Sequence, residues 1–316
     1  MKAERRRFLA YGSTALLSAC APGRSSNPDV TFIIPYAPGG GFDSYVRAVI
    51  PALQKSLGAL VIPQNVDGAG GAQAAQEIHR AKPDGSIISI VNIPGAMILR
   101  EQGGLDFDLQ KLSWIANMGR DAYALLVPAT SAIHSVDHLR ALGHQRPVKF
   151  TCVGAAGTAY SATKIGTRLL GVRSQIITGY KGTNDYIVAA VRGDGDAAIA
   201  SLASVNSYLK AKAVRVLCTF EKTGSLPGVP DATTLGLPDL VDIAQFRPIA
   251  GPPGMPAPII ERLSKAFISA LRQPSVVEWA ARNHANLTPD DPAETMRILQ
   301  NQAQFVTRWK NQLAVA

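Results

Sequence analysis

The stretch Pro35-Tyr36-Ala37-Pro38-Gly39-Gly40-Gly41-Phe42-Asp43-Ser44 lies between a predicted strand and a predicted helix. Its three consecutive glycines let the backbone turn sharply and approach a ligand closely. The first N–H groups of the following helix have no partner within that helix, so they form a potential anion site. Asp43 and Ser44 are good N-cap residues for this helix, and capping alone is the other interpretation of their side chains. The loop as a whole predicts a binding site for a small anion.

Short apolar runs alternate with amphipathic segments on both sides of this loop. Strands are predicted at 30–35, 59–63, 87–91, 150–153, 174–178, 197–200 and 214–220. Helices are predicted at 44–57, 72–81, 161–170, 184–191, 258–271 and 292–309. This alternation predicts an α/β fold of two lobes, each a mostly parallel sheet flanked by helices.

Three further loops follow predicted strands in the same way. Gly157-Thr158-Ala159-Tyr160-Ser161 brings small residues, two hydroxyl donors and an aromatic wall to a helix start, and Asn92-Ile93-Pro94-Gly95 and Tyr180-Lys181-Gly182-Thr183 follow two other strands. Ligands of open α/β sheets bind at the carboxyl ends of strands. With two loops from each half, the sequence predicts a ligand cleft between the lobes; for each loop the alternative is a plain turn with a helix cap.

Signatures of enzymes and of cofactor sites are weak. Ser44 stands where a dinucleotide-binding loop needs glycine, and no Lys-Ser or Lys-Thr pair completes a Walker pattern. There is no Gly-x-Ser-x-Gly elbow. His134 and His138 are four residues apart, but no third metal ligand follows them. We therefore expect no metal, no cofactor and no enzymatic activity.

The N-terminus has the pattern of an export signal. Basic residues up to Arg7 precede a short apolar run, 8–19, which is too short to span a bilayer. Arg5-Arg6-Arg7-Phe8-Leu9 resembles the twin-arginine signature, and Leu17-Ser18-Ala19-Cys20 resembles a bacterial lipobox, which predicts lipidation of Cys20. The alternative is an ordinary signal peptide with a chance cysteine. We assign 1–20 to the signal and 21–28 to a flexible tether.

Composition and cysteine usage agree with an exported binding protein. A hydrophobic fraction of 47% indicates a folded chain, and a net charge of +9 suits an anionic partner. The basic residues are scattered rather than clustered with aromatics, so nucleic acid is not expected to bind. Cys152 and Cys218 lie in apolar runs and are predicted to be buried thiols, with a disulfide as the alternative.

Over residues 29–312 the chain resembles the tripartite tricarboxylate transporter substrate-binding proteins, the TctC or Bug family. Its most specific stretch, Ile34 to Asp43, is similar to the family's Pro-Phe-x-Pro-Gly-Gly-Gly-x-Asp. Five further blocks follow in order: Asn65 with Gly68-Ala69-Gly70-Gly71, Lys82-Pro83-Asp84-Gly85, Gly157-Thr158, Tyr180-Lys181-Gly182 and Pro256-Ala257-Pro258-Ile259.

The resemblance implies a two-lobed periplasmic binding protein of the type II kind, with two crossover strands as the hinge. Lobe 1 would comprise 29–124 plus 247–316, and lobe 2 would comprise 125–246. The implied function is capture of a small carboxylate, such as a di- or tricarboxylate, for delivery to a membrane permease. The protein would be a periplasmic monomer that meets the membrane only through its lipid anchor. A ligand-sensing partner of a membrane receptor and an exported α/β hydrolase are the alternatives.

The resemblance also assigns ligand-binding residues. The carboxylate anchors are Tyr36, Gly40, Gly41, Asp43, Asn92 and Ile93. The residues that select the ligand are Gly157, Thr158, Ala159, Tyr160, Ser161, Tyr180 and Gly182, with Ser201 at the end of a further strand. Amino-acid-binding members carry an acid near this last position. Ala200-Ser201 offers none, which argues against an amino-acid ligand.

Overall fold

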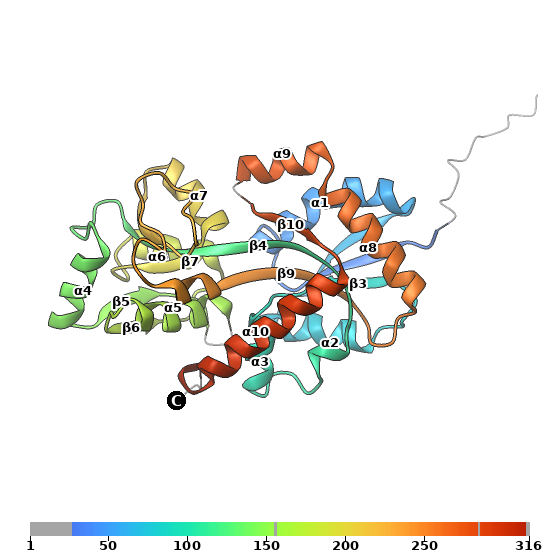
Figure 1. Cartoon of the computed structure of the whole chain (residues 1–316), viewed down its shortest axis with the longest axis horizontal. Helices are drawn as coiled ribbons and strands as arrows, with labels where there is room; N and C mark the ends of the chain where they lie inside the picture. The colour runs from blue at the N-terminus through green and yellow to red at the C-terminus, as the bar shows by residue number, and fades with distance from the viewer. Residues whose placement is uncertain (1–26, 155–156, 284, 314–316) are drawn as a thin grey trace, which may run out of the picture.

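A computed structural model describes residues 27–154, 157–283 and 285–313, which form two α/β halves joined by long strands (Figure 1). The predicted export signal, Cys20 and most of the predicted tether lie outside the described residues. Within the described ranges, no helix combines the length and the apolar character that crossing a bilayer requires.

The first half contains six strands of an eight-stranded mixed sheet. Their order is β10 (Leu287–Asp290), β4 (Ser113–Pro128), β9 (Ala244–Gly251), β3 (Ile87–Ile90), β1 (Val30–Ile34) and β2 (Val61–Asn65). The three N-terminal strands are parallel to one another, whereas β9 runs antiparallel to β3 and to β4. The carboxyl ends of β1 and β3 therefore lie at the same edge of the sheet.

Helices cover both faces of this sheet. One apolar cluster joins the sheet to α1 (Gly41–Leu57), α8 (Ala257–Leu271) and α9 (Pro274–Asn283). The other joins it to α2 (Ala72–Arg80), α3 (Gly95–Glu101) and α10 (Pro292–Leu313). Short 3-10 helices lie at Ala69–Gly71, Leu109–Lys111 and Pro238–Asp242.

The second half is built around the far end of β4. There β4 pairs with β7 (Ala198–Ser201) and β8 (Val214–Thr219), while β5 (Val148–Thr151) and β6 (Ser174–Ile177) form a parallel pair. A single bridge from Phe150 to Ala197 brings β5 beside the start of β7. The surrounding helices are α4 (Val136–Gln145), α5 (Thr158–Leu169), α6 (Thr183–Val191) and α7 (Leu202–Lys210).

Strand β4 belongs to both halves. Its residues 113–122 pair with β9, and its residues 123–128 pair with β7 and β8. All but two of its sixteen residues are buried, as expected for a strand covered on both faces. The sheet hydrogen bonds of β4 thus connect the two halves continuously.

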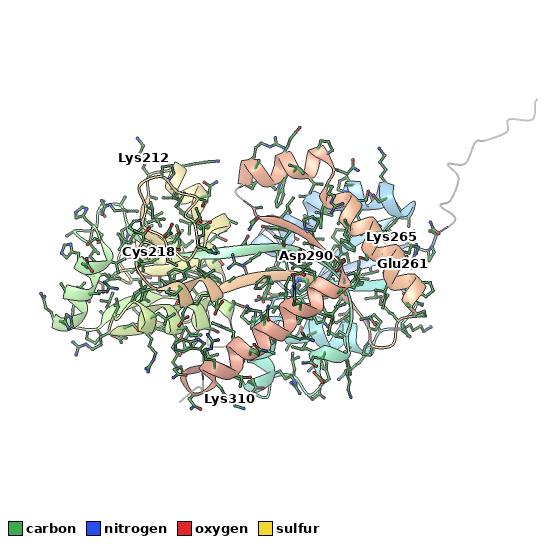
Figure 2. All side chains as sticks on the ribbon, viewed as in Figure 1. Lys212, Cys218, Glu261, Lys265, Asp290 and Lys310 are labelled. Carbon is green, nitrogen blue, oxygen red and sulfur yellow. The ribbon has the colours of Figure 1, made fainter. Side chains whose placement is uncertain are left out.

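Helix α10 packs against both halves, which the sequence-based division of lobes did not anticipate. Leu299 lies in the core of the first half, whereas Phe305, Val306 and Leu313 lie in the core of the second. Lys310, labelled near the C-terminal end of α10 in Figure 2, pairs with Glu101 of α3 at 2.8 Å. The helix runs from Pro292 to Leu313 and rises about 1.5 Å per residue, so it is long enough to cross the junction between the halves.

The two cysteines of the second half are buried and unpaired, which confirms the prediction of buried thiols. Cys218 lies on β8 within this half (Figure 2). Burial raises the pKa of each thiol to about 12. Neither thiolate is populated near neutral pH, so both residues behave as small apolar side chains.

We predict that Phe305→Ala lowers the free energy of unfolding by about 3 kcal/mol, because it removes a buried ring and leaves a cavity at the junction. Chemical denaturation followed by circular dichroism measures the change. Gln304→Ala, at an exposed position of the same helix, is the control and should shift stability by less than about 0.5 kcal/mol. Equal losses in the two variants would contradict the packing of α10 described above.

Candidate functional site

The helices that begin at the predicted binding loops and at Ser201, α1, α5, α6 and α7, have no side chain capping them. The N-cap residues of α1, α5, α6 and α7 are Gly40, Gly157, Gly182 and Ser201, none of which makes a side-chain cap hydrogen bond. Side-chain caps normally satisfy part of the free N–H groups at a helix start. Hydrogen bonds described below connect the start of α5, through Asn92, to Tyr36 in the loop that precedes α1 in the opposite half.

The triglycine loop is held by a buried carboxylate. Gly39 adopts a φ of 84°, which favours glycine, and its N–H donates to Asp43 at 2.9 Å. Asp43 also accepts from Arg47 at 2.9 Å and from Asn65 at 3.1 Å, and Asn65 donates in addition to the carbonyl of Tyr36. Asp43 thereby fixes the loop directly, through Gly39, and indirectly through Asn65, which holds Tyr36.

The prediction that Asp43 or Ser44 is the N-cap is wrong. The helix begins at Gly41, so Asp43 is its third residue and reaches back to Gly39. This is the position from which an acidic side chain closes a capping box. Burial by itself would raise the pKa of Asp43, but the hydrogen bonds from Arg47, Gly39 and Asn65 hold the pKa below its ordinary value. The Asp43 carboxylate is therefore ionised, and it stabilises the loop by accepting the hydrogen bond from Gly39.

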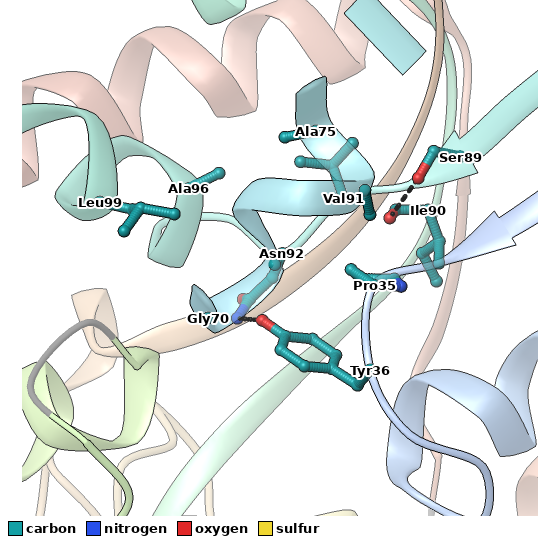
Figure 3. Close-up of a pocket in the computed structure, with 12 residues that line it drawn as sticks. Pro35, Tyr36, Gly70, Ala75, Ser89, Ile90, Val91, Asn92, Ala96 and Leu99 are labelled. Carbon is teal, nitrogen blue, oxygen red and sulfur yellow. Dashed lines mark hydrogen bonds between the residues drawn. The ribbon is translucent and has the colours of Figure 1, made fainter. Parts of the chain in front are cut away.

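A chain of side-chain hydrogen bonds joins the two halves at this edge. Asn92 follows β3 and donates through Nδ2 to the Tyr36 hydroxyl at 2.6 Å (Figure 3). Its Oδ1 accepts from the Thr158 hydroxyl of α5 at 2.9 Å and from Nε2 of Gln245 at 3.3 Å. Three residues proposed from the sequence therefore meet, and they come from three separate loops.

Gly95 permits this meeting. A Cβ atom at Gly95 would lie 2.4 Å from Oγ1 of Thr158 and 2.7 Å from Nδ2 of Asn92. Both separations are too short for any side chain. The loop after β3 can therefore approach the start of α5 only because this residue is glycine.

A small cavity lies behind Tyr36 and Asn92 (Figure 3). Its volume is about 20 Å³, room for one water molecule. It is bounded by β1, β3, the start of α2 and α3, and its lining includes Pro35, Gly71, Ser89 and Ala96. A water molecule there could connect a ligand to backbone groups of the first half.

An ion pair beneath the start of α1 was not foreseen from the sequence. Arg247 of β9 and Asp121 of β4 are both fully buried, and Nη2 of Arg247 lies 2.5 Å from Oδ2 of Asp121. The Tyr45 hydroxyl donates to the other oxygen of Asp121 at 2.9 Å. Burial would lower the pKa of Arg247, but the charge of Asp121 keeps it above its ordinary value, so the guanidinium is charged. The only sequence signal is the presence of charged residues inside two otherwise largely apolar strands, β4 and β9.

Ile93 does not fit its predicted role as an anchor. Its N–H and C=O groups both pair with Phe246, and its side chain is fully buried. It therefore fixes the position of its neighbour Asn92 and offers no free backbone group to a ligand.

The remaining predicted residues of the second half make local contacts near the ends of the strands that precede them. The Tyr180 hydroxyl donates to Asp194 at the other end of α6, and the Ser201 hydroxyl pairs with that of Ser204. In α5, Ala159 and Ser161 are buried, while the ring of Tyr160 lies 5.7 Å from the Lys164 ammonium. No hydrogen bond within the described residues links these side chains to Asn92.

Among the described residues, the histidine pair has no metal-binding partners. The rings of His134 and His138 lie 6.5 Å apart at the start of α4, whose N-cap is Ser135. Within the described ranges, no group of three histidine, cysteine or acidic residues could hold a metal ion.

Comparison with known proteins places this geometry in a family. The family model for the tripartite tricarboxylate transporter family receptor, TctC, matches residues 45–313. A UPF0065 protein of Agrobacterium vitis is 29% identical over 286 residues, which cover 86% of this chain and 80% of that protein.

Two solved structures share the fold over nearly their whole length. Rpa4515 of Rhodopseudomonas palustris with adipate has a TM-score of 0.83 and 20% identity, covering 92% of this chain and 99% of that chain. MatC of the same organism with bound malate has a TM-score of 0.77 and 22% identity, covering 91% and 99%. At these identities the likeness establishes the two-lobed fold.

We predict that Asp43→Ala lowers the free energy of unfolding at pH 7 by about 2 kcal/mol, because three donors lose a buried charged acceptor. The pKa of Asp43 is lower in the folded than in the unfolded chain, so its contribution is present above the unfolded pKa and lost as pH falls through the folded pKa. Thermal melts from pH 7 down to pH 3 should show the two proteins converging. The exposed Asp106→Ala variant should follow the unmodified protein throughout.

Proposed function

This chain belongs to the tripartite tricarboxylate transporter receptor family, and on that premise we propose that it captures a small carboxylate between its two lobes and presents it to a membrane permease. The family consists of transporter-associated receptors, so in this proposal the protein acts by binding its ligand and closing its two lobes over it. The observation that carries the proposal is the Tyr36–Asn92–Thr158 hydrogen-bond chain between loops of opposite halves.

The binding mechanism follows from the helix starts. Backbone N–H groups at the beginnings of α1 and α5 can donate to carboxylate oxygens, and such charge-assisted bonds are stronger than neutral ones. Closing the halves over the ligand removes water and strengthens these bonds further. A ligand that touches both halves stabilises the closed form by its preferential binding to that form. The permease then recognises the closed shape.

We assign the lobes to 29–124 plus 247–316 and to 125–246, with β4 and β9 as the connecting strands and the end of α10 packed on the second lobe. We further propose that Tyr36, Gly40, Gly41, Asp43 and Asn92 hold the carboxylate in the first lobe. In this proposal Gly157, Thr158, Ala159, Tyr160, Ser161, Tyr180, Gly182 and Ser201 form the second wall.

The ligand class follows from the chemistry of this site and from its relatives. Malate and adipate occupy two proteins of the same fold, and both are dicarboxylates. Strand β7 ends in Ala200-Ser201, so it places no acid at the position where a ligand ammonium would need one. We therefore propose an organic acid without an amino group.

The family implies a periplasmic location, and the basic, apolar start of the sequence fits an exported chain. We propose that Cys20 carries a lipid that keeps the receptor near its permease. A tether of residues 21–28 would separate the anchor from β1.

We predict that a thermal-shift screen of mono-, di- and tricarboxylates raises the melting temperature with one class of acid, and that calorimetry gives saturable binding of the best acid. Matched amino acids such as aspartate should give no shift. Stabilisation by amino acids without stabilisation by any carboxylate would contradict the ligand class, and no binding of either would contradict the function.

We also predict that Thr158→Val weakens binding of that acid by about tenfold, because the donor from the second half to Asn92 is lost. Thr307→Val is the matched control, since the Thr307 hydroxyl bonds only within α10. Calorimetry of both variants measures the effect. An affinity for Thr158→Val equal to that of the control would show that the bridge between the halves has no part in binding.

A further inference from the structure

Arg247 is a buried cation placed against the helix start that would receive the ligand. Its side chain is 2% exposed, and its guanidinium carbon lies 4.1 Å from the Tyr45 ring centroid and 4.9 Å from that of Phe42. Both rings belong to the first turns of α1. A Cβ atom at Gly41 would lie 3.5 Å from Nη2 of Arg247. The positive end of α1 and the guanidinium are therefore neighbours.

The hydrogen-bonding capacity of this guanidinium is only partly used. Nη2 contacts Asp121 and donates to Oε1 of Gln245 at 3.3 Å. Nε and Nη1 are buried and have no hydrogen-bond partner among the described residues. An arginine has five N–H donors, and leaving buried donors unpaired is costly. Two of its three nitrogens thus lack the acceptor that a closed core normally supplies.

A purely structural role accounts poorly for this arrangement. Buried ion pairs add little net stability, and apolar residues of similar volume commonly replace them without loss. The second carboxylate oxygen of Asp121 accepts a hydrogen bond from the Tyr45 hydroxyl, so Asp121 does not interact with Arg247 alone. Gln245 connects Arg247 to Asn92, because it accepts from Nη2 and donates to Oδ1 of Asn92. Arg247 is therefore part of the same network as the bridge between the halves.

We propose that Arg247 is a ligand-binding residue whose Nε and Nη1 donate to the carboxylate bound at the start of α1. The anchor of this receptor is then a guanidinium together with backbone amides. This inference rests on the proposed function and narrows it. A ligand ammonium beside the bound carboxylate would be repelled by the guanidinium, so the site takes carboxylic acids and rejects the matching α-amino acids.

Asp121 has a defined part in this scheme. It neutralises the guanidinium within the core and competes with the ligand carboxylate for the same cation. Removal of its charge should strengthen ligand binding even as it destabilises the fold. This opposition between affinity and stability distinguishes a ligand-binding arginine from a structural ion pair.

The test is calorimetry with malate, adipate, succinate and aspartate on the full-length protein and on four variants. Arg247→Met should bind the best dicarboxylate about 30-fold more weakly, because it removes a charge-assisted contact. Arg247→Lys should restore part of the affinity, since it keeps the charge and loses the planar fork. Asp121→Asn should bind more tightly than the unmodified protein.

Arg120→Met is the matched control. Arg120 lies on β4 next to Asp121, stacks on the Phe246 ring and donates to the carbonyl of Val241, away from the start of α1. Its loss should change affinity by less than about twofold. Thermal melts of each variant show whether it folds. If Arg247→Met does not fold, the affinity of Asp121→Asn still tests the proposal.

The outcomes separate the two proposals. Unchanged affinity in Arg247→Met, or equal weakening in Arg247→Met and Asp121→Asn, would overturn the role of Arg247 and leave the receptor function intact. Aspartate binding as tightly as malate would overturn the exclusion of amino acids. Failure of the unmodified protein to bind any carboxylate would instead overturn the proposed function.

Discussion

The side-chain amide of Asn92 holds the two halves of this protein in register. An amide is neutral and can donate and accept at the same time, so one residue bonds Tyr36 on its own side and Thr158 on the other. A carboxylate at this position could only accept while ionised, and it would repel an anionic ligand. The neutral bridge leaves the helix starts as the attractive feature for an anion.

The charges around the site are arranged in pairs that neutralise each other. Asp43 is matched by Arg47 on the outer side of the triglycine loop, and Asp121 is matched by Arg247 beneath it. With these pairs nearly cancelled, the positive end of α1 is exposed to little competing charge. In our proposal a small acid is attracted by the helix start and by Nε and Nη1 of Arg247, which have no hydrogen-bond partner among the described residues, rather than by a broad basic surface.

Much of the architecture was predictable because local patterns and tertiary packing agree. The parallel strands and their helices follow the apolar runs, and the loop after each strand was correctly placed at a carboxyl end. The predictions missed strand β4, which is buried on both faces, and the glycine start of α1, and they also left out the mostly exposed helices α7 and α9. Strand β4 has no alternating pattern to reveal it, and α1 begins before its supposed cap because Gly40 and Gly41 impose no barrier.

The sequence by itself determined most of the strand–loop–helix units and the family, and it suggested the residue types that we propose surround a ligand, because each of these depends on patterns among neighbours in the chain. Only the tertiary structure decided that Asn92 meets Thr158, that Gly95 must lack a side chain, and that α10 reaches the second half. It also decided that Arg247 and Asp121, 126 residues apart, form one buried pair. Such contacts depend on the register between distant strands, which no local pattern specifies.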